Sequence, residues 1–273
     1  MKMLAVILFI FFQTQLLIAD YIAFSPDLFF LKQYVKGFES TFKNSKSSLK
    51  FYIVDESKFF SDSESILSAV QQNIINFAVI PLKTFNRLNK SGELTSILKK
   101  TYQIKDVNTD FSDVIPFKLA LQNYGIFLLD LLEGGKYYLF SNNLVKTYKN
   151  LSIAVNNKLF VNILKKKFTN TFFVKKFNSL KGLMEKKFFK GVVINSFDFP
   201  RINTNFKYAY EMGLNREKLC FIVNLTYWNK LSMYDKSIVW AFCNRYKSLY
   251  RINMKKFQDR ILNKVLIKKL RIH

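Results

Sequence analysis

The sequence predicts an α/β protein of two lobes, each built on a parallel sheet, with a cleft between the lobes and a long helix in the C-terminal region. Two observations carry this prediction. Residues 21–80 follow the order strand, helix, strand, helix, strand, and residues 151–194 repeat that order. No glycine or proline occurs after Gly213, so no obvious signal stops a helix in the rest of the chain.

The first unit has three short predicted strands, at 21–24, 49–54 and 75–80. Apolar runs such as 77–80, in the strand predicted at 75–80, are typical of parallel strands covered on both faces. The helices between the strands begin at Pro26–Asp27 and at Ser63. Their predicted core-facing residues are Leu31, Val35, Phe38, Phe42, Ile66, Leu67 and Val70.

The middle of the chain gives weaker signals. Residues 86–123 show only weak helix and loop patterns, and the polar part at 99–113 is predicted to be a surface connection. Residues 117–140 then favour a helix and a strand around Gly125 and the pair Gly134–Gly135.

The second unit is predicted to have strands at 151–155, 171–174 and 191–194, separated by helices at 159–167 and 177–187. Two such units imply a bilobal molecule whose ligand lies in a crevice beyond the carboxyl ends of the strands. We expect lobe I to comprise 20–150 with 222–258, and lobe II to comprise 151–221 with 259–273.

The C-terminal region begins with a predicted strand at 220–223 and a short turn at 225–231. Ser232 and Asp235 then have the spacing of a capping box, which satisfies first-turn N–H groups of a helix. Apolar residues afterwards return to one helical face, at Ile238, Phe242, Tyr246, Leu249, Phe257, Ile261 and Val265. This stripe predicts one long helix, or two helices with a bend.

The N-terminus resembles a secretory signal peptide. Lys2 precedes an apolar run at 4–12, and Ala19 offers a small residue for cleavage. The run is too short for a comfortable membrane span, and no later stretch reaches about 18 uninterrupted apolar residues. We therefore expect residues 1–19 to be removed, leaving an exported, periplasmic protein that is not an integral membrane protein.

The formal net charge is +24, which could favour anionic ligands, nucleic acid or a membrane surface. The lysines are scattered along the chain in short clusters, so solvated faces account for them better than a nucleic-acid site, and no motif of a known nucleic-acid module occurs. The only histidine is His273, which rules out histidine-based triads and histidine-ligated zinc sites and argues against an enzyme. Cys220 and Cys243 are either two buried thiols or a bridge.

Five segments in order resemble the solute-binding proteins of tripartite ATP-independent periplasmic (TRAP) transporters. They are 64–85, with Asn73 where the family has a turn glycine, Gly134–Gly135–Lys136, 149–155, 177–195, and 223–232 with the long helix after it. The resemblance implies a periplasmic-binding-protein-like fold and no cofactor. It also implies capture of a small organic solute, often a carboxylate, for delivery to TRAP-type membrane permease subunits.

The resemblance also implies the ligand-binding positions, and this chain departs from the family at each of them. Ala154 stands where the family has a strand arginine that grips a carboxylate with two bonds, and Lys136 stands in place of a second arginine. Pro81 takes the place of a polar residue in the first lobe, and Asn195 lies one residue from the family's asparagine position. These departures support an alternative function, an interaction or structural protein of the envelope that retains the fold without binding a solute.

Overall fold

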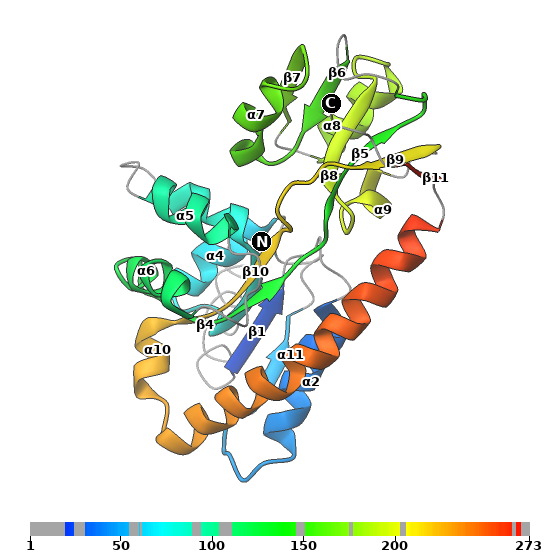
Figure 1. Cartoon of the computed structure of the whole chain (residues 1–273). Coiled ribbons are helices and arrows are strands. Elements are labelled where there is room, and N and C mark those ends of the chain that lie inside the picture. Colours follow the sequence, from blue (N-terminus) through cyan, green and yellow to red (C-terminus); the bar gives the residue numbers. More distant parts are fainter. Residues whose placement is uncertain are drawn as a thin grey trace, which may run out of the picture. The chain divides into compact units, whose positions relative to one another are not determined.

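A computed structural model describes residues 20–24, 31–54, 60, 62–88, 94–103, 111–145, 151–174, 177–202, 206–263 and 266–268 (Figure 1). The predicted signal peptide and the predicted helix start at Pro26–Asp27 lie outside these residues. Contacts divide the chain into two compact units. The first contains the described residues of Met1–Leu88, Val114–Leu132 and Leu219–Tyr250, and the second contains those of Asn89–Asp113, Glu133–Lys218 and Arg251–His273.

The first unit is built on a five-stranded sheet in the order β2-β1-β3-β10-β4. Its strands are β1 (Asp20–Phe24), β2 (Phe51–Ile53), β3 (Phe77–Pro81), β4 (Ile126–Glu133) and β10 (Lys218–Asn224). Strands β1, β2 and β3 are parallel, as predicted, whereas β10 runs antiparallel to β3. Every residue of β3 and β10 is buried, so their apolar sequences do not indicate whether the two strands pair in parallel or antiparallel.

The helices of this unit enclose an aromatic core. They are α2 (Lys32–Lys43), α4 (Ser63–Gln71), α6 (Phe111–Gln122), α10 (Leu225–Lys230) and the start of α11 (Met233–Leu262), with a 3-10 helix η2 at Leu82–Leu88. The Phe38 ring of α2 lies within 5.4 Å of the rings of Phe77, Phe221 and Phe242, centroid to centroid. Helix α2 therefore joins the sheet to α11 through one buried ring.

The second unit is built on a six-stranded sheet in the order β11-β9-β5-β8-β6-β7. Its strands are β5 (Tyr137–Ser141), β6 (Ser152–Val155), β7 (Asn170–Phe173), β8 (Gly191–Asn195), β9 (Tyr208–Glu211) and β11 (Leu266–Lys268). Strands β6, β7 and β8 are parallel, and β5 runs antiparallel to β8 and β9. Its helices are α5 (Leu94–Gln103), α7 (Lys158–Lys165), α8 (Phe177–Glu185) and α9 (Phe199–Ile202).

The prediction of two α/β units is confirmed, and the two sheets are mixed rather than parallel throughout. The bounds of the units also differ from the expected lobes. Strand β5 pairs with β8 and β9, so the chain enters the second unit near Glu133 and not near residue 150. Helix α5 joins the second unit as well, and its Tyr102 hydroxyl reaches Glu217.

Several local predictions can be compared directly. Asn73 has a φ of 57°, in the left-handed region that asparagine tolerates. The segment expected to be a short turn after β10 is helix α10, and α11 is a single helix of 30 residues. Leu249, predicted to face the core, is 49% exposed. Cys220 and Cys243 are both buried, and no disulfide joins them.

The capping box is present with one change. The Ser232 hydroxyl accepts a hydrogen bond from the Asp235 N–H at 3.0 Å and donates to the Asp235 carboxylate at 2.5 Å. The other carboxylate oxygen of Asp235 accepts a hydrogen bond from Ser47. The carboxylate thus ties the start of α11 to the loop after α2 instead of reaching its own backbone.

Replacing Asn224, the residue that caps α10, should destabilise the first unit. Its side-chain oxygen accepts from the Tyr227 N–H at 2.9 Å, and its amide donates to the Val70 carbonyl at 2.8 Å. We expect Asn224→Ala to lower the free energy of unfolding in urea by about 1–2 kcal/mol. Asn229→Ala, on the exposed face of the same helix, is the control and should change it by less than about 0.5 kcal/mol.

Candidate polar site at the carboxyl edge of the second sheet

Buried polar side chains gather where the parallel strands β6 and β8 end. Asn156 and Asn157 follow β6 directly, and Asn195 is the last residue of β8. Their exposed fractions are 7%, 1% and 2%. Because β6 and β8 are parallel neighbours, their carboxyl ends meet at one edge of the sheet, where open α/β sheets bind ligands.

Asn195 fixes the backbone on both sides of it. Its amide donates to the Gly135 carbonyl at 2.9 Å, and its side-chain oxygen accepts from the Phe197 N–H at 2.8 Å. A Cβ on Gly135 would lie 2.4 Å from this oxygen and 2.3 Å from the Ser196 hydroxyl oxygen. A side chain at residue 135 would therefore have to displace the Asn195 and Ser196 side chains.

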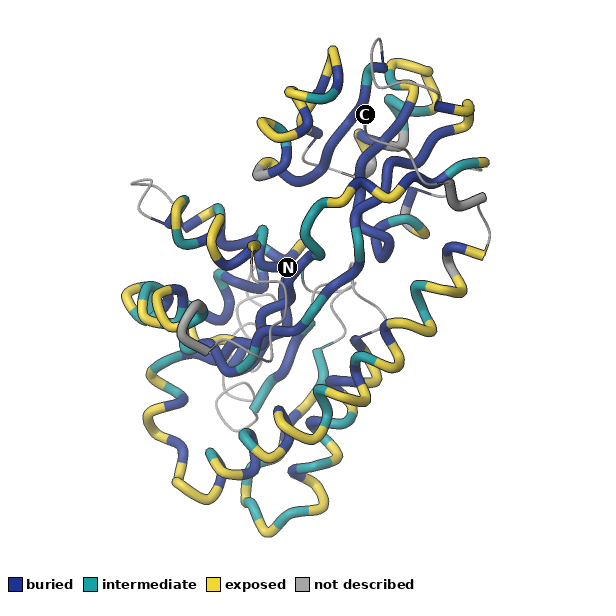
Figure 2. The backbone as a smooth tube through the Cα atoms, in the orientation of Figure 1, coloured by how far each residue is buried: buried dark blue, intermediate teal, exposed yellow. Residues whose placement is uncertain are grey.

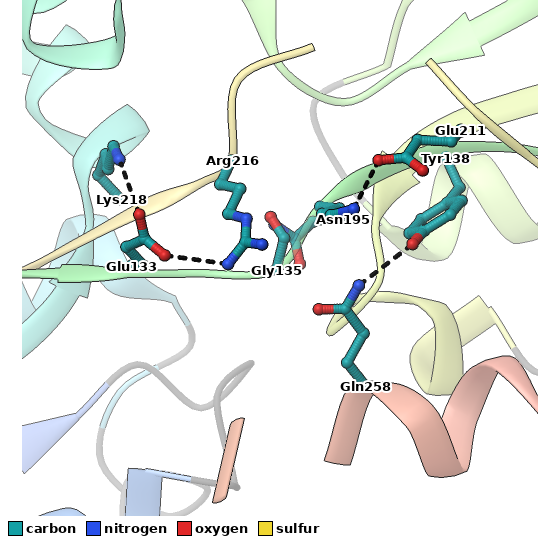
Figure 3. A network of polar contacts seen from close by, with 9 residues as sticks. Glu133, Gly135, Tyr138, Asn195, Glu211, Arg216, Lys218 and Gln258 are labelled. Atoms are coloured by element: carbon teal, nitrogen blue, oxygen red, sulfur yellow. Dashed lines mark hydrogen bonds and ion pairs between the residues drawn. The ribbon is translucent and has the colours of Figure 1, made fainter. Parts of the chain in front are cut away.

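Two chain segments, 133–136 and 216–218, cross in close contact beside this edge. The Gly134 N–H donates to the Glu217 carbonyl at 2.6 Å, and the Glu217 N–H donates to the Gly135 carbonyl at 3.0 Å. The Glu133 carboxylate lies between Arg216 and Lys218 (Figure 3). One carboxylate oxygen is 2.9 Å from an Arg216 guanidinium nitrogen, and the other is 3.9 Å from the Lys218 Nζ. The Lys218 side chain is 1% exposed, so its charge is offset inside the protein by Glu133.

The Glu217 carboxylate is buried at this crossing and accepts hydrogen bonds from two tyrosines. Tyr102 donates to one oxygen at 2.7 Å and Tyr137 donates to the other. Burial raises the pKa of both hydroxyls well above the usual value for tyrosine, and the Glu217 carboxylate raises each pKa further. Both hydroxyls therefore stay protonated and act as donors. Asn157 donates to the Tyr137 oxygen at 3.0 Å and so links this cluster to the end of β6.

Two buried polar atoms at the edge lack a hydrogen-bond partner among the described residues. They are the Asn156 side-chain oxygen and the Ser196 hydroxyl. The Asn156 amide donates to Asp198 at 3.3 Å, which leaves its oxygen as an acceptor. A buried polar atom without a partner costs about 1–3 kcal/mol, and a bound molecule carrying hydroxyl groups could recover part of that cost.

The residues implied by the sequence resemblance are only partly brought together. Asn195 and Lys136 both belong to the edge, since the Ser196 N–H donates to the Lys136 carbonyl at 2.8 Å. The Lys136 ammonium is half-buried and lies 2.6 Å from the Glu211 carboxylate. Ala154 is fully buried in an apolar cluster with residues such as Val192 and Leu180, so its side chain faces the core. Pro81 is the last residue of β3 and belongs to the first unit.

Sequence analysis did not identify Tyr102, Tyr137, Asn156, Asn157 and Glu217 as members of this cluster. Asn156 and Asn157 could have been found, because they are the first polar residues after a predicted strand. Glu217, Tyr102 and Tyr137 could not have been found, because their contact depends on the crossing of segments that lie far apart in the sequence.

The described residues contain no group of three or more histidine, cysteine or acidic side chains arranged to hold a metal ion. The helices within these residues also include none long and apolar enough to cross a bilayer.

Solved structures show what the fold is. A TRAP periplasmic solute-binding protein from Chromohalobacter salexigens with bound d-glucuronate superimposes with a TM-score of 0.73 at 13% identity, covering 92% of this chain and 88% of that one. One from Desulfovibrio salexigens with bound orotic acid gives a TM-score of 0.73 at 13% identity, covering 93% and 86%. One from Pseudomonas aeruginosa with bound L-malate gives a TM-score of 0.71 at 12% identity, covering 92% and 93%.

The chain has the fold of a TRAP solute-binding protein. The resemblance found in the sequence is thereby confirmed at the level of the fold. No protein-family model and no curated protein matches the chain. The TRAP fold is therefore retained here in a sequence that has diverged widely from these structures.

Adding a methyl group at the crossing should destabilise the second unit. A Cβ on Gly134 would lie 2.8 Å from the Glu217 carbonyl oxygen and 3.0 Å from its carbonyl carbon, and backbone atoms cannot easily move away. We expect Gly134→Ala to lower the free energy of unfolding, measured in urea, by roughly 1–3 kcal/mol. Gly182 lies in helix α8, where a new Cβ would meet no atom within 4 Å outside its own helix backbone and chain neighbours. Gly182→Ala should therefore raise the free energy of unfolding by roughly 0.5–1 kcal/mol.

Restoring an arginine at residue 154 tests whether that position belongs to a site or to the core. Ala154 is fully buried among apolar side chains, so the charge of Ala154→Arg would lack a partner. We expect a loss of about 3 kcal/mol or more in unfolding free energy. Ala241→Arg, at an exposed position of α11, is the control. Equal stability of the two variants would show that residue 154 can turn its side chain out of the core.

Proposed function

We propose that the chain is a periplasmic solute-binding protein of a TRAP-type transporter, which captures a small organic solute and delivers it to membrane permease subunits. The observation that carries this proposal is the TRAP fold itself, which extends over 92% of the chain. The three neighbours described above hold glucuronate, orotic acid and malate, all small organic acids. The proposal assigns binding and transport to the chain, and no chemical reaction.

The carboxyl edge of the second sheet supplies the groups that would hold a solute in this proposal. The Asn156 oxygen would accept a hydrogen bond from a solute hydroxyl, and the Ser196 hydroxyl would donate or accept one. Lys136 would contribute positive charge, provided that a solute carboxylate replaces Glu211 as its partner. Hydroxylated organic acids, which offer both a carboxylate and hydroxyl donors, fit this set of groups.

The second candidate, an envelope interaction protein that retains the fold without binding a solute, is favoured by one feature. At this edge the cations already pair with carboxylates of the chain: Lys136 with Glu211, and Arg216 with Glu133. The hydroxyls of Tyr102 and Tyr137 likewise donate to Glu217. A solute carboxylate must compete with these internal partners.

Calorimetric titration with d-glucuronate, L-malate, orotate and a neutral sugar tests the proposed function. We expect at least one organic acid to bind and the sugar not to bind. Lys136→Ala should weaken that binding by about tenfold to a hundredfold, the scale of a charge-assisted hydrogen bond. Glu211→Gln, which releases Lys136 from its partner, should strengthen it.

Lys255→Ala, at an exposed lysine of α11, is the matched control for the loss of one charge and should leave affinity unchanged. Binding that ignores both Lys136→Ala and Glu211→Gln would overturn the role of Lys136. Failure of every acid to bind the folded wild-type chain would favour the envelope interaction protein.

A further inference from the structure

Strand β1 begins at Asp20, the first residue after the signal-peptide cleavage that the sequence predicts. It lies between β2 and β3 in the first sheet. Its first two residues are half-buried and the next two are buried (Figure 2). The described residues of both units all lie at Asp20 or later in the chain. Removal of residues 1–19 would therefore leave a new α-amino group at the start of an interior strand.

The Asp20 side chain is held by helix α10. The Tyr227 hydroxyl donates to an Asp20 carboxylate oxygen at 2.5 Å. The Asp20 backbone N–H donates to the Lys50 carbonyl at 3.3 Å, beside the start of β2. Desolvation raises the pKa of the Asp20 carboxyl, the bond from Tyr227 lowers it, and the charge of Asp235 raises it. Burial and a second carboxylate thus oppose the ionisation of Asp20.

The second carboxylate, Asp235, belongs to the first turn of α11. It is 9% exposed and accepts hydrogen bonds from Ser47 and Ser232 at 2.5 Å each. Burial and Asp20 raise the pKa of the Tyr227 hydroxyl, and the charge of Asp235 raises it further. The field of Asp235 therefore reaches both members of the Asp20–Tyr227 pair.

No lysine or arginine of the described residues pairs with either carboxylate. Their side-chain partners are the hydroxyls of Tyr227, Ser47 and Ser232. This is unexpected in a chain with 43 lysines and arginines and 19 acidic residues. Two carboxylates that act on each other favour a positive charge nearby, because it removes their repulsion.

We propose that processing of the N-terminus supplies this charge: the α-ammonium group of a chain that begins at Asp20 pairs with the carboxylates of Asp20 and Asp235. The step is hydrolysis of the peptide bond between Ala19 and Asp20. Water gives its oxygen to the Ala19 carbonyl carbon, which becomes the carboxylate of the released peptide. The Asp20 nitrogen leaves as an amine and is protonated at neutral pH.

The gain on folding comes more from Asp235 than from Asp20. The α-ammonium and the Asp20 carboxylate belong to one residue, so they are also close in the unfolded chain. Asp235 comes near only in the folded first unit, and only there is the charge of Asp20 desolvated. The positive end of α11 shares Asp235 with the ammonium, which keeps the effect moderate. In the unprocessed chain the Asp20 nitrogen is an uncharged amide and contributes no such pairing.

Two chains separate the position of the charge from its presence. One begins at Asp20, and the other begins at Ala19, so that the same charge lies one residue further from Asp235. Mass spectrometry of the exported full chain should first find a mature N-terminus at Asp20. In NMR titrations, the α-amino pKa should exceed the ordinary value of about 7.7–8.0 in the chain that begins at Asp20 and stay ordinary in the other.

Urea unfolding at neutral pH should give a folding equilibrium constant about threefold to tenfold larger for the chain that begins at Asp20. A raised α-amino pKa in the folded state contributes stability below the unfolded pKa, and that stability is lost as the pH rises through the folded pKa. The two chains should therefore become equally stable near about pH 10.

Asp235→Asn should remove the difference between the two chains. It also weakens the bonds from Ser47 and Ser232 and so destabilises both chains, which is why only their difference is compared. Asp259→Asn, at an exposed position of α11, is the matched control and should leave the difference unchanged. The α-amino titration of the two unsubstituted chains decides the proposal if Asp235→Asn does not fold.

Three results would overturn the proposal. One is a mature N-terminus at another residue, and another is an equal α-amino pKa in the two chains. The third is a stability difference that persists near about pH 10 or in Asp235→Asn, because the added alanine would then disturb β1 by its bulk and not by moving the charge. Solute binding enters none of these measurements, so their failure and the failure of the proposed function are distinguishable.

Discussion

The crossing of residues 133–136 with 216–218 is the constraint on which the second unit depends. Hydrogen bonds between Gly134, Gly135 and Glu217 bring the two backbones so close that a side chain on Gly134 would collide with the Glu217 backbone. The crossing then determines the polar neighbours. It places Glu217 against Tyr102 and Tyr137, and it presents the Gly135 carbonyl to Asn195. A change in the path of either segment would move the end of β8 and the start of β5 together.

The second sheet has chemically different edges because its helices all return in the same sense. The carboxyl edge collects amide, hydroxyl and carboxylate groups that are almost fully buried, and these satisfy most of one another's hydrogen bonds. The lysines that follow α7 and α8 lie at the amino edge, where the sequence offers few acidic residues to offset their charge. Buried, paired groups suit the selection of a small molecule, whereas exposed, unbalanced ones suit a broad surface.

Much of the fold could be predicted from the sequence because buried strands such as β3 and β8 are short apolar runs between helical patterns. The antiparallel direction of β10 and β5 could not be predicted, because a fully buried strand has the same apolar sequence pattern in a parallel and in an antiparallel pair. Polarity after a strand end could have indicated Asn156 and Asn157, whereas Asn195 was predicted from the family resemblance. Ala154 was placed by resemblance alone, and only packing against Val192 and Leu180 reveals that it faces the core. Long-range crossings, as at Glu217, leave no local pattern.

The strand order of the first sheet has a consequence for how the chain folds. Strand β10 lies between β3 and β4, yet it comes from residues more than a hundred positions later than β3. Contacts of such high sequence separation must close long loops, which slows folding. Until residue 224 has been synthesised, the apolar β3 has an unpaired edge that other chains can pair with. The nascent chain thus gains most from a chaperone during the interval between the synthesis of β3 and that of β10.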